Sequence, residues 1–187
     1  MLTHSNQLVG LILAAGKSSR MLVDKAFINY HEQPQFEHAA NQLLPFVNKV
    51  IISGKENAAY GNYEVVLDQK EFKDNGPISG LLSAIKFYPN CSFFILGCDY
   101  PYLSNESLKI LSDKFLETNK SVCFINNTNG YLEPLVAIYS AEDLKKIFAF
   151  WQSKQTSLRH FLESINPLIL SAPHNNDILS IDTPIIE

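Results

Sequence analysis

Short apolar runs alternate along the chain with segments of helical periodicity. The apolar runs predict buried strands, because each has the length of a strand and is bounded by polar or turn-forming residues. They span Leu8–Ala14, Lys49–Ser53, Tyr63–Leu67, Ser92–Cys98, Val122–Ile125 and Leu135–Tyr139. Helical spacing follows Pro34 and recurs in Ile78–Phe87, Ala141–Phe150 and Ser157–Leu162, and Ser104 is the predicted cap of one more helix. A last extended piece covers Ile178–Ile181.

This order of elements predicts an α/β fold. Strands that alternate with helices indicate a Rossmann-like three-layer sandwich, with a mostly parallel sheet and helices on both faces. Ser92–Cys98 is the most apolar run and is therefore the expected central strand. A chain of 187 residues is long enough to bury its own core, so we expect a single domain over residues 1–187.

Composition narrows the classes of function. An apolar fraction of 46% and a charged fraction of 18% are typical of a soluble globular protein. The formal net charge of -4 does not indicate a protein that binds nucleic acid. Any cations that bind phosphate must therefore be clustered at one site. Three cysteines without a Cys-x-x-Cys pair indicate neither a disulfide framework nor a zinc site. We find no signal peptide and no apolar stretch of membrane-spanning length, which predicts a cytoplasmic protein without a membrane partner.

The segment that follows the first strand has the composition of a phosphate-binding loop. Leu8–Ala14 leads into Gly16, small residues and the cations Lys17, Arg20 and Lys25. Backbone N–H groups of such a loop can point at an anion, and Lys or Arg neutralises the charge. Five residues separate Gly10 from Gly16, where a P-loop requires four, and the Gly-x-Gly-x-x-Gly dinucleotide fingerprint is missing. The loop therefore belongs to neither of these two types.

The stretch from Leu13 to Ala26 resembles the opening signature of the MobA-like nucleotidyltransferases, roughly Leu-Ala-(Gly/Ala)-Gly-x-Ser-x-Arg-Met-Gly-x-Asp-Lys-Ala. One position departs from it, because Leu22 stands where the family usually has Gly, and we expect another backbone path there. Three further matches follow in the family's order, so the resemblance extends from Leu8 to Pro184. They are Gly76-Pro77-x-x-Gly80-Leu81, Asp99-x-Pro, and Ser180-Ile181-Asp182-Thr183-Pro184, in which Ser180 replaces the usual Asn. The resemblance implies the nucleotide-diphospho-sugar transferase-like version of the α/β sandwich.

Polar residues that follow separate strands can be collected into one site. In an open α/β sheet, ligands bind at the carboxyl ends of the strands, where the strand order reverses. The first strand delivers the loop and Lys25, and later strands deliver Asp68, Asp99 and Asp182. Cations and carboxylates at one edge suit a metal–nucleotide complex, although Asp68 and Asp182 could equally be turn residues.

Asp99 is the residue for which the sequence argues most strongly for a role in binding a cation. A carboxylate at the end of a run as apolar as Phe93–Cys98 is costly to desolvate unless it is paired or bound to a cation. Mg²⁺ takes one or two carboxylates together with phosphate oxygens. The alternative is a carboxylate that caps a neighbouring helix or faces water. Gly80 is informative for a different reason: in the first turn of a helix it costs about 1 kcal/mol of propensity, which indicates close approach to a ligand or a neighbouring strand.

The resemblance assigns roles to these residues. It implies catalytic roles for Lys25, Asp99 and Arg20, and a Mg²⁺ site at Asp99 and Asp182. The nucleotide-binding residues that it implies are Leu13, Ala14, Ala15, Gly16, Ser18, Lys25, Asp68, Gly76, Pro77, Gly80 and Asp99. Glu133-Pro134-Leu135 resembles a family segment near the acceptor site, and Thr156–Glu163 resembles a late helix of the family. The five histidines show no metal-ligand spacing.

The implied reaction is that of a molybdenum cofactor guanylyltransferase. GTP and Mo-molybdopterin would react, with Mg²⁺, to give the guanine dinucleotide cofactor and pyrophosphate, and transient contact with other proteins of this biosynthesis is expected. Ala15 leaves a molybdopterin cytidylyltransferase open, because Ala-Ala-Gly is common in that related group. A sugar-phosphate nucleotidyltransferase is disfavoured because those enzymes usually have longer chains. The departures from the family pattern at Leu22 and Ser180 would instead indicate a catalytically silent nucleotide-binding protein.

Overall fold

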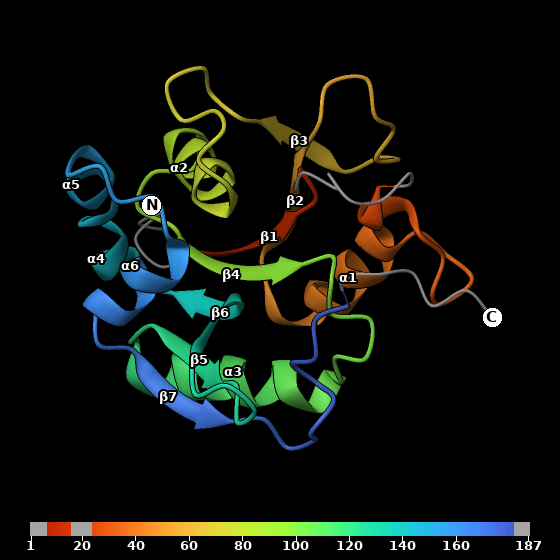
Figure 1. The fold of residues 1–187 in the computed structure, drawn as a ribbon. Coiled ribbons are helices and arrows are strands. Elements are labelled where there is room, and N and C mark those ends of the chain that lie inside the picture. Colours follow the sequence, from red (N-terminus) through yellow and green to blue (C-terminus); the bar gives the residue numbers. More distant parts are fainter. Residues whose placement is uncertain (1–6, 16–23, 182–187) are drawn as a thin grey trace, which may run out of the picture.

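The computed structural model describes residues 7–15 and 24–181, and within them it contains one seven-stranded sheet (Figure 1). The strands are β1 Leu8–Leu13, β2 Lys49–Gly54, β3 Glu64–Leu67, β4 Ser92–Gly97, β5 Val122–Ile125, β6 Leu132–Tyr139 and β7 Leu168–Ser171. Their order across the sheet is β3-β2-β1-β4-β6-β5-β7. All neighbouring pairs are parallel except the two that involve β6, which is antiparallel to both β4 and β5.

Helices cover both faces of this sheet, as the sequence predicts. They are α1 Gln35–Leu43, α2 Pro77–Phe87, α3 Asn105–Thr118, α4 Ala141–Leu144, α5 Ile147–Gln152 and α6 Leu158–Ser164, with the 3-10 turns η1 Lys25–Phe27 and η2 Leu44–Phe46. Helices α1 and α3 lie on one face, and α2, α4, α5 and α6 lie on the other (Figure 1). The three-layer α/β sandwich is therefore confirmed. Nowhere in the described ranges is a helix long and apolar enough to cross a bilayer.

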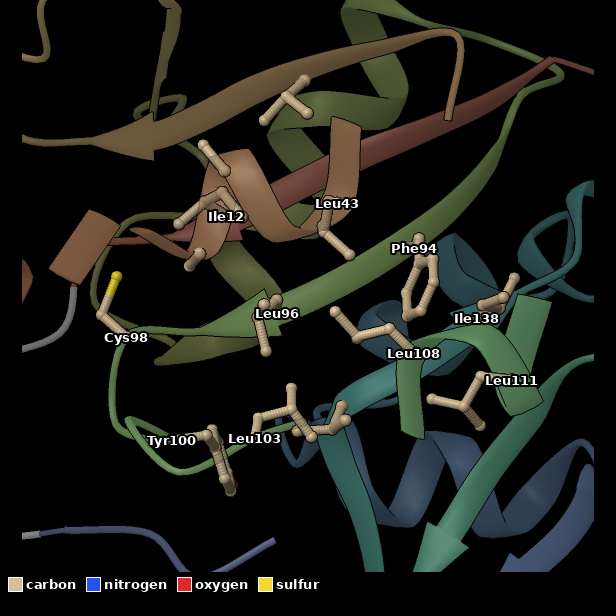
Figure 2. Close-up of a cluster of buried hydrophobic side chains, with 14 of the residues drawn as sticks. Ile12, Leu43, Phe94, Leu96, Cys98, Tyr100, Leu103, Leu108, Leu111 and Ile138 are labelled. Carbon is tan, nitrogen blue, oxygen red and sulfur yellow. The ribbon is translucent and has the colours of Figure 1, made fainter. Parts of the chain in front are cut away.

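Alternation along the strands divides the core into two halves. Successive strand residues point to opposite faces of a sheet, so a strand buried on both sides must be apolar throughout. In β4, Phe93 and Ile95 pack toward α2 and α6, whereas Phe94 and Leu96 pack toward α1 and α3. Figure 2 shows the second half, in which Phe94 and Leu96 meet Leu43 of α1 and Leu108 of α3. All six residues of β4 are buried, and β4 lies in the middle of the sheet, as predicted.

Four details of the sequence interpretation are corrected. The strand β7 was not predicted, because the apolar run Leu168–Leu170 is short, and at the sheet edge its residues alternate between partly buried and exposed. The expected strand Ile178–Ile181 is not part of the sheet. The helix expected over Ala141–Phe150 is divided into α4 and α5, with the Lys145 N–H bonded to the Glu142 carbonyl in a tight turn. A pattern of apolar runs also carries no strand direction, which is why the antiparallel course of β6 was not foreseen.

The strand directions determine which residues share an edge of the sheet. The carboxyl ends of β1, β2, β3 and β4 meet at one edge because these strands are parallel. β6 runs the other way, so its first residues rather than its last lie at this edge, and Val136 pairs with Leu96 near the end of β4. The strand order also reverses between β1 and β4, which is where an open α/β sheet holds its ligand.

Candidate active site

A cavity of about 590 Å³ opens at this edge of the sheet. Its volume lies within the range typical of small-ligand sites. Its walls come from the ends of β1, β2, β3 and β4, from the segment before α2, and from the start of β6. The lining residues are Leu13, Ala14, Ala15, Asp24, Lys25, Ser53, Gly54, Lys55, Glu56, Leu67, Asp68, Lys73, Asp74, Gly76, Pro77, Gly80, Gly97, Cys98, Asp99 and Leu135.

Nine of the residues predicted to bind a nucleotide line this single cavity: Leu13, Ala14, Ala15, Lys25, Asp68, Gly76, Pro77, Gly80 and Asp99. Residues that follow different parallel strands, and are far apart in the sequence, therefore line one cavity, as expected for an open α/β sheet. The remaining predicted site residues, Gly16, Ser18, Arg20 and Asp182, lie outside the described residues, as do Lys17 and Leu22.

Lys25 is positioned by a short turn with its own cap. Asp24 precedes η1, and its Oδ1 accepts a hydrogen bond from the Ala26 N–H at 3.3 Å. The other carboxylate oxygen of Asp24 pairs with the Lys55 ammonium group at 2.5 Å. Lys25 Nζ donates a hydrogen bond to the Ile181 carbonyl at 2.8 Å. The turn thus presents one cation to the cavity wall while the adjacent carboxylate is neutralised.

Asp99 lies directly beyond the end of β4 and folds back over it. A Cβ atom added at Gly97 would lie 2.5 Å from Asp99 Oδ1, so the absence of a side chain at Gly97 makes room for this carboxylate. The Asp99 carbonyl accepts a hydrogen bond from the Ile181 N–H at 2.8 Å. Burial, together with the charges of Asp99 and Asp24, raises the pKa of the Cys98 thiol, which also lines the cavity. Cys98 therefore remains a neutral thiol.

Asp68 has an unsatisfied acceptor in the cavity wall. It follows β3, and its Oδ1 is buried without a hydrogen-bond partner. Burial raises the pKa of the Asp68 carboxyl, and the positive charge of Lys73 offsets part of this shift. An unsatisfied buried acceptor is costly, by about 1–3 kcal/mol, and a ligand that brings N–H donors would remove that cost.

The segment before α2 brings backbone close to the cavity. Gly76 has φ +74° and ψ -151°, a combination essentially restricted to glycine, and Pro77 begins the helix. A Cβ atom added at Gly80 would lie 2.4 Å from Ser53 Oγ and 2.8 Å from Leu13 Cδ2. Of the two explanations offered for Gly80, close approach to neighbouring strands is thus confirmed, and the same approach lets α2 reach the cavity wall.

A second, smaller cavity of about 300 Å³ adjoins the first and shares Pro77 and Leu135 with it. The Arg159 guanidinium lies 4.2 Å from the centre of the Tyr131 ring in its wall. Glu133 is part of the same wall, and burial raises the pKa of its carboxyl although Tyr100 donates a hydrogen bond to it. Segments 133–135 and 156–159 therefore line one cavity, and the first of them is the segment that the resemblance places near the acceptor site.

The side chains that line the cavity fit a magnesium ion that would be bound mainly through phosphate oxygens. In the described part of the chain, no group of three or more His, Cys, Asp or Glu side chains could hold a metal ion. Mg²⁺ does not require such a group, because it keeps several waters and is held by one or two carboxylates together with phosphate oxygens. Asp99, at the cavity wall beside Ile181, fits this role.

Sequence reasoning missed Ser53 and Lys55. Both lie at the end of β2 and line the cavity, and the rule that gathers polar residues after each strand could have found them had it been applied to Lys49–Ser53. Glu133 and Leu135 were named only through the family resemblance, because that rule considers residues after a strand and these two lie near the start of one. They reach this edge of the sheet because β6 is antiparallel to β4.

Comparisons with known proteins agree with this geometry. A molybdenum cofactor biosynthesis bifunctional protein from Synechocystis is 31% identical over 71% of the chain, which spans only 39% of that relative's length. A protein from Bacillus mycoides named "Probable molybdenum cofactor guanylyltransferase" is 28% identical over 84% of the chain and 80% of its own length.

Solved structures share the fold. The crystal structure of molybdopterin-guanine dinucleotide biosynthesis protein A from Archaeoglobus fulgidus superposes with a TM-score of 0.74 at 17% identity, covering 94% of this chain and 93% of its own. The sheet and its helices are therefore those of the nucleotide-diphospho-sugar transferase-like fold. The model of the MobA-like NTP transferase domain matches residues 10–169. This match reaches from β1 into β7, and the chain therefore belongs to the MobA-like NTP transferase domain family.

Proposed function

We propose that this protein is a molybdenum cofactor guanylyltransferase, which transfers GMP from GTP to Mo-molybdopterin and releases pyrophosphate. The observation that carries the proposal is the convergence of Lys25, Asp68 and Asp99 on one cavity of nucleotide size. The names of relatives that match most of the chain support the same reaction.

The nucleotide would occupy the larger cavity with its base near Asp68. Guanine presents N1–H and an amino group side by side, and a carboxylate can accept hydrogen bonds from both. Cytosine offers only its amino group on that edge. The buried Asp68 oxygen without a partner supports guanine for this reason. The triphosphate would extend toward Lys25, with Gly16, Ser18 and Arg20 as further proposed contacts.

Transfer requires no covalent enzyme intermediate. An oxygen of the acceptor's terminal phosphate would attack the α-phosphorus of GTP in line. The bond from the α-phosphorus to the bridging oxygen would break, and its electron pair would leave with pyrophosphate. The protein then contributes positioning and charge neutralisation, by Lys25 and Arg20 on the phosphate oxygens. Asp99, together with Asp182, would hold Mg²⁺, which supplies additional positive charge at the phosphates when bound.

The acceptor would occupy the smaller cavity. Because the two cavities share Pro77 and Leu135, a molecule in the second can reach the phosphate end of the first. Arg159 offers a guanidinium group to an anionic acceptor. Proteins of the same biosynthesis would deliver this acceptor through transient contact.

The deciding experiment is a pyrophosphate-release assay with molybdopterin as acceptor and each of the four nucleoside triphosphates in turn. We expect release with GTP and Mg²⁺ and little with the other three. Preference for CTP would assign the protein as a molybdopterin cytidylyltransferase, in agreement with Ala15 in the cavity wall. Tight GTP binding without release would instead indicate a catalytically silent binding protein.

A further inference from the structure

The segment from Ala172 to Ile181, which we call the C-terminal strap, joins the two sides of the candidate site. It leaves β7, passes the start of α3 and reaches the end of β4 (Figure 1, blue). At its end, the Ile181 N–H donates to the Asp99 carbonyl at 2.8 Å, and the Ile181 carbonyl accepts from Lys25 Nζ at 2.8 Å. One residue of the strap thus contacts the residue proposed to bind Mg²⁺ and the cation proposed to bind the triphosphate.

Asp177 attaches this strap to the body of the protein. Its side chain is 2% exposed, and its two oxygens accept three hydrogen bonds from the start of α3. The donors are the Ser104 N–H at 3.1 Å, the Ser104 hydroxyl at 2.9 Å and the Ser107 hydroxyl at 2.6 Å. A carboxylate at this end of a fourteen-residue helix also gains from the helix dipole.

The rest of the strap is attached by turn hydrogen bonds and by one buried apolar side chain. Two turn hydrogen bonds, from the Asp177 N–H to the His174 carbonyl and from the Leu179 N–H to the Asn176 carbonyl, shape the segment internally. The side chain of Ile178 is buried in the core half that includes Tyr100 and Leu103. The pairing of His174 with Glu106 is largely exposed and contributes little. Among the described contacts, Asp177 is thus the charged group that fixes the strap four residues before Ile181.

We propose that Asp177 is a positioning residue, which holds the C-terminal strap so that Ile181 orients Lys25 and Asp99 toward the nucleotide. Its effect on turnover rests on the proposed function, whereas its effect on the strap does not. Displacement of a reacting group by about 1 Å costs roughly a hundredfold in rate, so a loosened strap should be visible in kcat.

The chain offers a matched control at the opposite edge of the sheet. Asp143, in α4, accepts hydrogen bonds from the Ser121 and Ser140 hydroxyls at 2.7 and 2.9 Å. Ser140 follows the carboxyl end of β6, and Tyr139 pairs with Phe93 near the start of β4, so this group lies away from both cavities. Asp143→Ala removes a carboxylate that accepts two serine hydroxyls, as Asp177→Ala does, without touching the strap.

The experiment compares Asp177→Ala, Asp177→Asn, Ser107→Ala and Asp143→Ala with the parent protein, each below its melting temperature. We expect the Ile181 amide hydrogen to exchange about tenfold faster in Asp177→Ala, with smaller increases in Asp177→Asn and Ser107→Ala. In Asp177→Ala, kcat should fall about ten- to hundredfold and the Mg²⁺ concentration for half-maximal rate should rise. The affinity for guanosine, which lacks the phosphates that Lys25 would bind, should stay within about twofold. Asp143→Ala should lower the melting temperature and leave the other readouts unchanged.

Two results would overturn the proposal: an Ile181 amide that stays protected in Asp177→Ala, or faster exchange with unchanged kcat and Mg²⁺ dependence. Should Asp177→Ala fail to fold, Asp177→Asn and Ser107→Ala decide the same question. A parent protein that neither binds guanosine nor releases pyrophosphate would contradict the proposed function. In that case the exchange of the Ile181 amide alone decides whether Asp177 holds the strap.

Discussion

At the scale of single residues, Asp99 is the side chain whose loss should separate chemistry from folding. Asn has nearly the same shape as Asp and fits the space that Gly97 leaves open, so Asp99→Asn should keep the fold. It removes the charge that would hold Mg²⁺, and removing one well-placed electrostatic contact typically costs about 10²–10³ in rate. We expect an unchanged melting temperature without metal and a loss of that size in turnover at saturating Mg²⁺.

The control for this change is Asp113→Asn, which alters an exposed carboxylate on α3. It should leave both measurements unchanged. Unfolding of Asp99→Asn, or turnover within about threefold of the parent, would show that Asp99 is structural or peripheral.

Asp68 should lower the stability of the ligand-free protein and strengthen the binding of GTP. Because burial raises the pKa of its folded carboxyl above the unfolded value, its stabilising contribution is present at low pH and is lost as pH rises through the folded pKa. At neutral pH the ionised carboxylate therefore destabilises the ligand-free protein. Asp68→Asn should raise the melting temperature at pH 7 and weaken GTP binding by about tenfold or more.

Melting curves from pH 7 down to about pH 4 check the origin of this effect. The advantage of Asp68→Asn over the parent should shrink as the parent carboxyl takes up its proton. If the advantage were the same at every pH, the charge of Asp68 would not be its cause.

At the scale of elements, the turn before α2 depends on the backbone of Gly76. Any side chain at φ +74° and ψ -151° is strained by about 1–3 kcal/mol, although a Cβ atom there would meet no neighbour within 4 Å. Gly76→Ala should lower the free energy of unfolding by this amount and should weaken nucleotide binding as the cavity wall moves.

Gly61→Ala provides the comparison for Gly76→Ala. Gly61 also has a positive φ, of +61°, and open space around it, but it does not line either cavity. Denaturant unfolding should show a loss of stability in both variants, and calorimetry should show weaker GTP binding only in Gly76→Ala. Equal binding by the two variants would mean that the turn has no part in the site.

The elements also show what the sequence could predict and what it could not. Buried strands such as β4 are continuous apolar runs, and the polar residues after them mark the edge of the sheet where Asp68 and Asp99 lie. The choice of Lys25 rested on the resemblance of Asp24-Lys25-Ala26 to the family signature. The pattern does not encode direction, so the antiparallel course of β6, which brings Glu133 to that edge, was missed. Asp177 lies in a segment without periodicity, and only the folded chain brings it to Ser104 and Ser107.

At the scale of the whole molecule, the two halves of the core hold the site from opposite sides of the sheet. One half fixes α1, α3 and, through Ile178, the strap beside Asp99, and the other fixes α2 and the cavity wall around Gly80. A nucleotide that contacts both sides would bind the folded state alone. Its affinity should therefore appear directly as added stability.

Thermal unfolding with each nucleoside triphosphate and Mg²⁺ tests this coupling and the choice of base together. At a concentration about 100 times the Kd, a ligand of the folded state adds about 2.7 kcal/mol. For a protein of this size, that corresponds to a rise of about 5–10 °C in Tm. GTP should give this shift, and a triphosphate bound tenfold more weakly should give about 1.4 kcal/mol less at the same concentration. The shift with GTP should fall by about half or more in Asp68→Asn, because the carboxylate that would accept the guanine N–H groups is gone. A larger shift with CTP than with GTP would contradict guanine recognition and assign the cavity to cytidylyl transfer.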